Sequence, residues 1–215
     1  MSTAAPALVH LGPLAQLRAG RLTRRLVQLL VGLVMYGVSV AMMVRGGLGV
    51  APWDVLTSGF VRHVSISFGQ AVIAISFVVL LFWLPLRETP GIGTLANAFL
   101  IGLSADATLA VLSQPASLVP RAGLMLGGIA LCGLATAVYI GAQLGRGPRD
   151  GLMTGLARRT GLSLRLVRTA LEVTVVLVGV ALGGQLGIGT VLFAVTIGPI
   201  AQALLPVFLV SVRGD

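Results

Sequence analysis

Four acidic residues are the groups in this sequence best placed to bind a solute or an ion. Asp54 and Asp150 each stand two residues after a proline, in a short element that begins Leu-Gly. Asp106 and Glu172 lie inside long apolar runs, where an ionisable group is costly and marks a functional candidate. Together with Gln202, a polar residue in the last apolar run, they are our candidate substrate- and ion-binding residues.

The two aspartates of the short elements also have structural interpretations. A carboxylate in the first turn of a helix faces unpaired amide groups and the positive end of the helix dipole, so capping alone is one explanation of Asp54 and Asp150. A salt bridge, for instance with Arg45 or Arg149, is another. The sequence leaves capping, ion pairing and direct binding open.

The two acidic residues in apolar runs differ in their neighbours. Glu172 follows Arg168 by four positions, a spacing at which helical side chains form an ion pair, so a helix-face pair is the alternative to a functional role. Asp106 has no basic residue within one helical turn, which favours a place in a polar cavity.

The short elements belong to a sequence that occurs twice. Shifting the chain by 96 positions places Gly49 and Pro52 on Gly145 and Pro148 (148 − 52 = 96). The same repeat offset places Gly-Ile-Gly-Thr at 91–94 on the identical motif at 187–190, and we expect Thr94 and Thr190 to N-cap the helices that follow. A register shared by separate motifs indicates duplicated architecture.

The composition predicts an all-α membrane protein. Apolar residues make up 56% of the chain, charged residues 10%, and mean hydropathy is +1.02, against about 25% charged residues in soluble domains. The net charge of +9 lies in short arginine clusters between apolar runs, which membrane topology explains without nucleic acid as a partner. The single Cys132 provides no metal cluster or disulfide framework, and we expect neither metal nor cofactor.

Six apolar runs have about the 20 residues needed to cross a bilayer. They are Leu26–Val44, Phe68–Leu86, Thr94–Leu112, Ala122–Gln143, Leu164–Leu182 and Thr190–Val210. We divide the chain into an N-terminal cytoplasmic or interfacial segment (1–23), a first three-helix repeat (24–112), a linker (113–121), a second, inverted repeat (122–210) and a C-terminal tail (211–215).

Arginine placement predicts the orientation. With the N-terminus in the cytoplasm, twelve arginines lie inside and three (Arg45, Arg62 and Arg121) lie outside, as the positive-inside rule favours. Both termini are then cytoplasmic. Because each repeat has three spans, the second copy enters the membrane upside down.

Each short element, from Pro52 and from Pro148, is predicted to be a helix that either re-enters the membrane or lies at its surface. Arg146, Arg149, Arg158 and Arg159 favour the surface for the second.

The motifs Leu48-Gly49-Val50-Ala51-Pro52-Trp53-Asp54 and Gly145-Arg146-Gly147-Pro148-Arg149-Asp150, followed by Gly187-Ile188-Gly189-Thr190, resemble the YczE/YyaS/YitT family of bacterial integral membrane proteins, and its YczE-like branch most. The resemblance extends from about Arg24 to Pro206. It implies a multi-helix protein of the bacterial cytoplasmic (inner) membrane, and it implies no particular activity.

Two functions compete. The inverted repeat favours a secondary transporter or permease for a small solute, with the candidate residues near its centre. Six spans are few for a complete transporter, which makes a homodimer a reasonable expectation. The alternative is a non-transporting scaffold or assembly factor, in which the short elements and the Arg-rich loop Arg146–Arg168 are docking surfaces or bind anionic lipid headgroups. We do not expect an enzyme, because His10 and His63 are poorly placed for catalysis and no second carboxylate adjoins Asp106.

Overall fold

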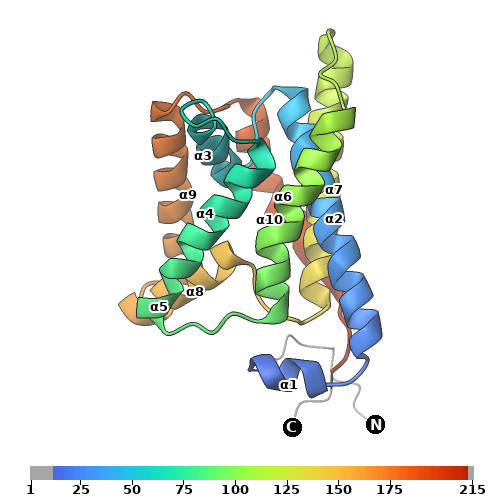
Figure 1. Ribbon diagram of the computed structural model, residues 1–215, viewed down its shortest axis with the longest axis vertical. Coiled ribbons are helices and arrows are strands. Elements are labelled where there is room, and N and C mark those ends of the chain that lie inside the picture. Colours follow the sequence, from blue (N-terminus) through green and yellow to red (C-terminus); the bar gives the residue numbers. More distant parts are fainter. Residues whose placement is uncertain (1–11, 213–215) are drawn as a thin grey trace.

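The computed structural model describes residues 12–212, and the chain within that range is entirely helical. The predicted N-terminal segment up to residue 11 and the last three residues of the predicted tail lie outside the described residues. The helices are α1 (Pro13–Arg18), α2 (Leu22–Gly46), α3 (Pro52–Phe60), α4 (Phe68–Leu81), α5 (Trp83–Leu86), α6 (Ile92–Val111), α7 (Leu118–Gly141), α8 (Pro148–Thr160), α9 (Leu164–Ala181) and α10 (Ile188–Phe208) (Figure 1).

Five helical stretches are long and apolar enough to cross a membrane. They are α2, the continuous stretch of α4 and α5, α6, α7 and α10. The predicted fifth span forms α9, but Arg165, Arg168 and Glu172 put three charged residues within its 18, whereas each of the other five contains an apolar stretch of that length with two or fewer. Length and composition therefore support five of the six predicted spans.

The outer surface of the helix assembly is apolar. Large hydrophobic side chains such as Leu84 (74% exposed), Val111 (85%) and Val195 (68%) have no covering protein around them. Lipid chains can cover such a surface, whereas its exposure to water would cost roughly 25 cal/mol for each Å² of apolar area. The side chains thus define a protein that is embedded in a bilayer.

The first helices of the two copies, α2 and α7, pack antiparallel on glycine contacts. Gly32 lies against Tyr139, and Gly128, its counterpart at the repeat offset, lies against Met43. Tyr139 and Met43 are themselves counterparts, so one contact occurs twice. These glycines are close contact points, because a Cβ at Gly32 would lie 2.8 Å from the backbone nitrogen of Tyr139.

Two arginines close the ends of these helices in the same reciprocal way. Arg25, fully buried at the start of α2, donates hydrogen bonds to the Ala142 and Gln143 carbonyls beyond the end of α7. Arg121, its counterpart on α7, donates to the carbonyls of Gly46 and Gly47 at the end of α2. A guanidinium satisfies carbonyls that have no intrahelical partner and complements the negative end of the dipole.

The short helices α3 and α8 begin after glycines in left-handed backbone. Gly49 has φ +112° and Gly145 φ +125°, conformations that side chains with a Cβ rarely adopt. Each turn approaches the other copy closely, since the Gly93 N–H donates to the Leu144 carbonyl and the Gly189 N–H donates to the Leu48 carbonyl, both at 2.8 Å. These two bonds are also related by the repeat offset.

The predicted N-caps of α6 and α10 are wrong by three positions. The N-cap residues are Gly91 and Gly187. Thr94 instead stands at the third helical position, where its Oγ1 accepts a hydrogen bond from the Gly91 N–H and donates one to the Arg146 carbonyl. Thr190 is buried at the matching position, and its Oγ1 has no hydrogen-bond partner. Glycine tolerates the tight approach to the other copy that a capping threonine would block.

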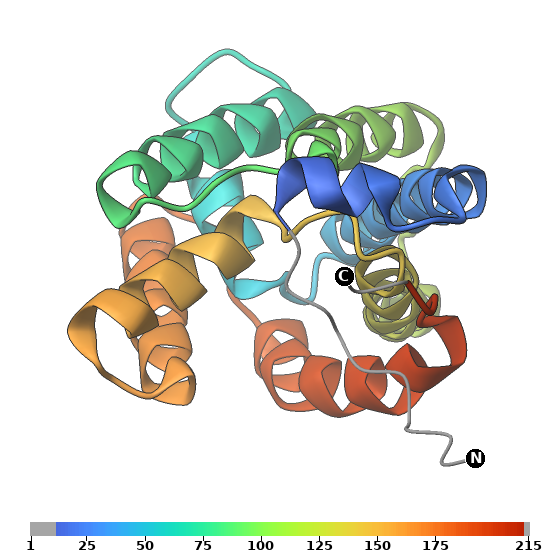
Figure 2. The same cartoon turned by 90° about the horizontal axis from the view of Figure 1, so that it is seen from below.

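One helix–helix contact of the first copy has no counterpart of similar extent in the second copy, among the described residues. In the first copy α4 packs directly on α6, where the Gly69 and Gly102 backbones touch. Among the described residues the matching helices α9 and α10 have no comparable contact, and Gly198, the counterpart of Gly102, faces open space. Figure 2 shows α4 beside α6 and α9 standing apart from α10. We call these pairs the α4–α6 seam and the α9–α10 seam.

Candidate functional site

A cavity of about 260 Å³ lies where the two copies meet, and we call it the central cavity. The starts of α3 and α8 reach it, and α2, α4, α6, α7, α9 and α10 surround it. Along α6 it ends at Ile101, but along α10 it continues from Phe193 to Leu205. The central cavity therefore extends into the open α9–α10 seam and stops at the closed α4–α6 seam.

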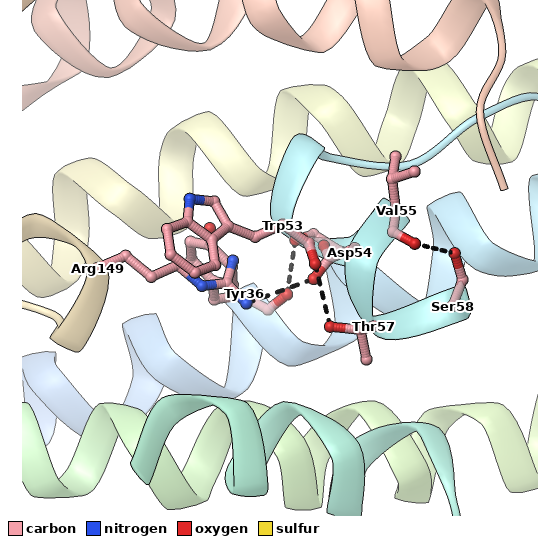
Figure 3. Close-up of polar contacts among 8 residues, drawn as sticks. Tyr36, Trp53, Asp54, Val55, Thr57, Ser58 and Arg149 are labelled. Carbon is pink, nitrogen blue, oxygen red and sulfur yellow. Dashed lines mark hydrogen bonds and ion pairs between the residues drawn. The ribbon is translucent and has the colours of Figure 1, made fainter. Parts of the chain in front are cut away.

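Trp53 and Arg149 bring the starts of the short helices together. They are counterparts at the repeat offset, each at the second position of its helix. The guanidinium carbon of Arg149 lies 5.2 Å from the centre of the Trp53 ring, a distance at which a cation is attracted to an aromatic face (Figure 3).

Asp54 forms a buried ion pair with Arg149. The distance from Asp54 Oδ1 to Arg149 Nη2 is 3.5 Å, and the Asp54 side chain is 2% exposed. That oxygen has no hydrogen-bond donor, so the ion pair leaves its acceptor capacity partly unused. Burial raises the pKa of Asp54, and Arg149 opposes the rise by favouring the charged form. Of the interpretations open from the sequence, ion pairing with Arg149 is the one seen, while Arg45 donates to the Leu109 carbonyl.

Asp150 interacts with uncharged donors. The Tyr139 hydroxyl donates a hydrogen bond of 3.1 Å to Asp150 Oδ2, and the Gly147 backbone N–H also bonds to the carboxylate. Part of the Asp150 surface remains open to the cavity. Burial within the protein raises the pKa of Asp150, while Tyr139 and the more distant Arg168 and Arg149 lower it.

Glu172 and Gln202 line the open end of the cavity, on α9 and α10. Glu172 accepts a hydrogen bond of 2.8 Å from Arg168 Nε, the helix-face pair that the sequence allowed. Four of the five candidate residues (Asp54, Asp150, Glu172 and Gln202) thus line one cavity.

Asp106 is the candidate that the central cavity does not include. Its Oδ1 accepts a hydrogen bond of 2.7 Å from the Gly69 N–H at the start of α4, and its Oδ2 accepts one from the Ser67 hydroxyl. Asp106 therefore joins α6 to the first turn of α4 and holds the closed seam. Its counterpart Gln202 has no such partner helix, because α9 stands apart.

The sequence did not single out the aromatic residues of the cavity. Tyr36 and Tyr139 line it with their rings 6.2 Å apart, edge to face, and Trp53 and Phe193 add two further walls. In an apolar helix an aromatic residue is ordinarily a packing residue, so only its place beside a carboxylate in the folded protein shows that it lines the cavity. Tyr139 was signalled indirectly, by lying eleven residues before Asp150 on the helix that precedes it.

The fold and the cavity define the class, a multi-pass helical membrane protein with a charged cavity enclosed by two similar halves. Residues 23–206 match the family described as "Family of unknown function (DUF6198)", and the chain belongs to this family. No solved structure matches the chain.

The relatives are bacterial proteins of similar length. A Haemophilus influenzae protein named "Uncharacterized protein" is 42% identical over 82% of this chain and 81% of its own. The Bacillus subtilis "Uncharacterized membrane protein YczE" is 33% identical over 81% and 82%. YyaS of Bacillus subtilis is 26% identical over 82% and 90%. The resemblance to the YczE/YyaS proteins is confirmed.

Proposed function

We propose that the protein is a secondary transporter or permease for a small solute, and that the central cavity is its binding site. Alternating access requires two states in which one site opens to opposite sides of the membrane. The carrying observation is that one seam beside the central cavity is packed and its counterpart is open.

The proposal includes six spans in two inverted repeats, with α9 as the sixth. Its support is the antiparallel packing of α2 on α7 and the reciprocal contacts of Arg25 and Arg121. The charges of Arg168 and Glu172 are compatible with a span because both side chains line a cavity in which they pair with each other.

The proposed orientation places both termini in the cytoplasm of a bacterium. The central cavity extends along α10 toward its C-terminal end, and Arg21 and Ser211 bring the two ends of the described chain together there. The open seam therefore faces the cytoplasm in this proposal, and the described state is inward-open.

The scaffold alternative is less well supported. Arg158 and Arg159, predicted as docking residues, donate to the Leu86 and Pro85 carbonyls, and Arg158 also pairs with Glu88. These arginines hold α8 to α5, which leaves less of their charge for a partner protein or for lipid headgroups. The proposal involves no covalent chemistry, and the homodimer stays a prediction.

Two alanines at counterpart positions test the proposal. Ala201 lines the open end of the cavity, whereas Ala105 is 0% exposed on α6. Each would be changed to cysteine in a Cys132→Ser background and treated with a membrane-impermeant maleimide in inside-out and right-side-out vesicles. Ala201→Cys should react from the cytoplasmic face.

The decisive result concerns the closed seam. If the protein alternates, Ala105→Cys reacts slowly from the opposite face, and locking the α9–α10 seam with a cross-linker at Ala201→Cys and a cysteine on α9 speeds that reaction. If the protein is a static scaffold, Ala105→Cys stays unreactive whether or not the α9–α10 seam is cross-linked. This outcome would reject the transporter.

A further inference from the structure

The charges lining the central cavity do not balance. Three carboxylates and two guanidinium groups face it: Asp54, Asp150, Glu172, Arg149 and Arg168. Arg149 is engaged by Asp54 and Arg168 by Glu172. Asp150 is left as the cavity carboxylate without an ion pair among the described residues, and its hydrogen-bond donors, the Tyr139 hydroxyl and the Gly147 N–H, are neutral. One additional positive charge would balance the charges that line the cavity.

The walls around Asp150 suit an organic group. Tyr139 and Tyr36 stand edge to face, and Trp53 already carries a cation, the Arg149 guanidinium, over its ring. Aromatic faces attract cations and also pack against carbon chains. A volume of about 260 Å³ exceeds the needs of a bare metal ion and approaches that of small-molecule sites.

We propose that the central cavity binds a small organic cation, whose ammonium group pairs with Asp150 and whose carbon skeleton packs against Tyr139 and Trp53. This inference rests on the proposed function, because it names the class of solute that would be carried. The partly unused acceptor capacity of Asp54 Oδ1, at the same helix junction, favours a ligand that donates hydrogen bonds.

Protons compete with such a ligand. The charged form of Asp150 is the one that binds an ammonium group, so binding strengthens as the pH rises through the raised pKa of Asp150. The titratable or charged groups that face it are Tyr36 on α2, Asp54 on α3, Tyr139 on α7, Arg149 on α8, and Arg168 and Glu172 on α9.

The test uses three probes of one shape on the purified full-length protein. Isothermal titration calorimetry at pH 8 compares benzylammonium with benzyl alcohol and benzoate, which are respectively neutral and anionic. We expect saturable binding of benzylammonium and at least about tenfold weaker binding of the other two. Tighter binding of benzoate, or displacement of benzylammonium by an equal concentration of Na⁺ or K⁺, would overturn the proposal.

Two variants test whether the Asp150 carboxylate is the group that binds the ammonium. Asp150→Asn should weaken benzylammonium binding at least about tenfold, whereas Glu88→Gln, a matched change in the half-buried ion pair with Arg158 outside the cavity, should leave it unchanged. Equal affinity in Asp150→Asn and wild type would contradict the proposal. If Asp150→Asn does not fold, a titration of the wild type from the ordinary carboxyl value of 3.8 up to pH 8 decides, since an affinity that does not rise with pH across that range is the contradicting result.

The two proposals can fail separately. Proteoliposomes loaded with radiolabelled benzylammonium measure its exchange against the external probe. Binding without exchange leaves the cation site in place and rejects transport of this class. Exchange of an anion or a neutral solute that is insensitive to Asp150→Asn keeps the transporter and rejects the cation site.

Discussion

At the scale of single residues, the centre of the molecule depends on how two equivalent aspartates found different partners. Asp54 pairs with Arg149, while Asp150 binds the neutral Tyr139. The difference arises because Trp53 occupies the position in the first copy that Arg149 occupies in the second. One carboxylate is thereby compensated within the protein, and the other has no ion pair among the described residues.

The buried pair predicts a strong coupling in stability. Arg149→Gln leaves Asp54 charged, 2% exposed and unpaired, and removing one partner of a buried pair costs about 3–5 kcal/mol. The double variant Asp54→Asn with Arg149→Gln removes both charges and should recover most of that loss. Thermal unfolding of all four proteins in one detergent measures the coupling. Additive effects of the two changes would show that the pair is not coupled.

The raised pKa values predict how stability depends on pH. For Asp54 and Asp150 the folded protein holds its protons more tightly than the unfolded chain does, where the carboxyl pKa is 3.8. Their contribution to stability is full below that value and is lost as the pH rises through the folded pKa values. The melting temperature should therefore fall as the pH rises from 3.8 through the folded pKa values, and it should fall less steeply in Asp150→Asn. A wild-type melting temperature that rises with pH there would contradict the assignment.

At the scale of helices, glycine at the facing positions decides whether two helices can pack closely. The α4–α6 seam is packed because Gly69 meets Gly102 without side chains, and Asp106 then accepts a hydrogen bond from the Gly69 N–H. On α9 the counterpart of Gly69 is Arg165, so the α9–α10 seam lacks one of the two glycines. Equivalent helices with different facing residues are free to adopt different separations.

A pair of glycine substitutions tests this asymmetry. In Gly102→Ala the new Cβ would lie 2.4 Å from the Gly69 carbonyl oxygen, and overpacking of this kind costs about 1–3 kcal/mol. Gly198→Ala meets nothing within 4 Å, so it should be neutral or gain up to about 1 kcal/mol in helix propensity. Unfolding of both variants in detergent gives the comparison. A larger loss for Gly198→Ala would mean that the α9–α10 seam is closed in solution.

At the scale of the whole molecule, two similar halves enclose one cavity and expose apolar surface to lipid. The halves are joined by reciprocal bonds, from Arg25 and Arg121 and from Gly93 and Gly189. These bonds place the central cavity at the junction of the two halves, and the proposed transport function requires that junction to open toward either face of the membrane.

The proposed orientation predicts which loops a reagent can reach. The α6–α7 loop and the α5–α6 loop lie at opposite ends of the helices (Figure 1). Gln114 belongs to the first loop and Thr89 to the second, and both residues are exposed. In intact spheroplasts a membrane-impermeant maleimide should label Gln114→Cys and spare Thr89→Cys until the membrane is permeabilised. Cys132 is buried and serves as the unlabelled control. Labelling of Thr89→Cys alone would invert the orientation.

Much of this architecture was predictable from the sequence. The duplication is visible in the shared register of Gly49, Pro52, Gly145 and Pro148, and helix boundaries followed because apolar length and Pro-Gly punctuation are local properties. Asp106 and Glu172 were found for the same reason, since a carboxylate in an apolar run is conspicuous without any structure, and the repeated Pro-x-Asp spacing identified Asp54 and Asp150.

Only the tertiary structure decided what those residues do. Partners such as Arg149 for Asp54 and Gly69 for Asp106 lie on other helices, and no spacing along the chain encodes the distance between them. The exclusion of Asp106 from the cavity and the open α9–α10 seam likewise depend on how pairs of helices pack. Local periodicity determines which segments are helical, whereas a contact between groups 37 or 95 positions apart (106 − 69 and 149 − 54) is a property of the packed molecule.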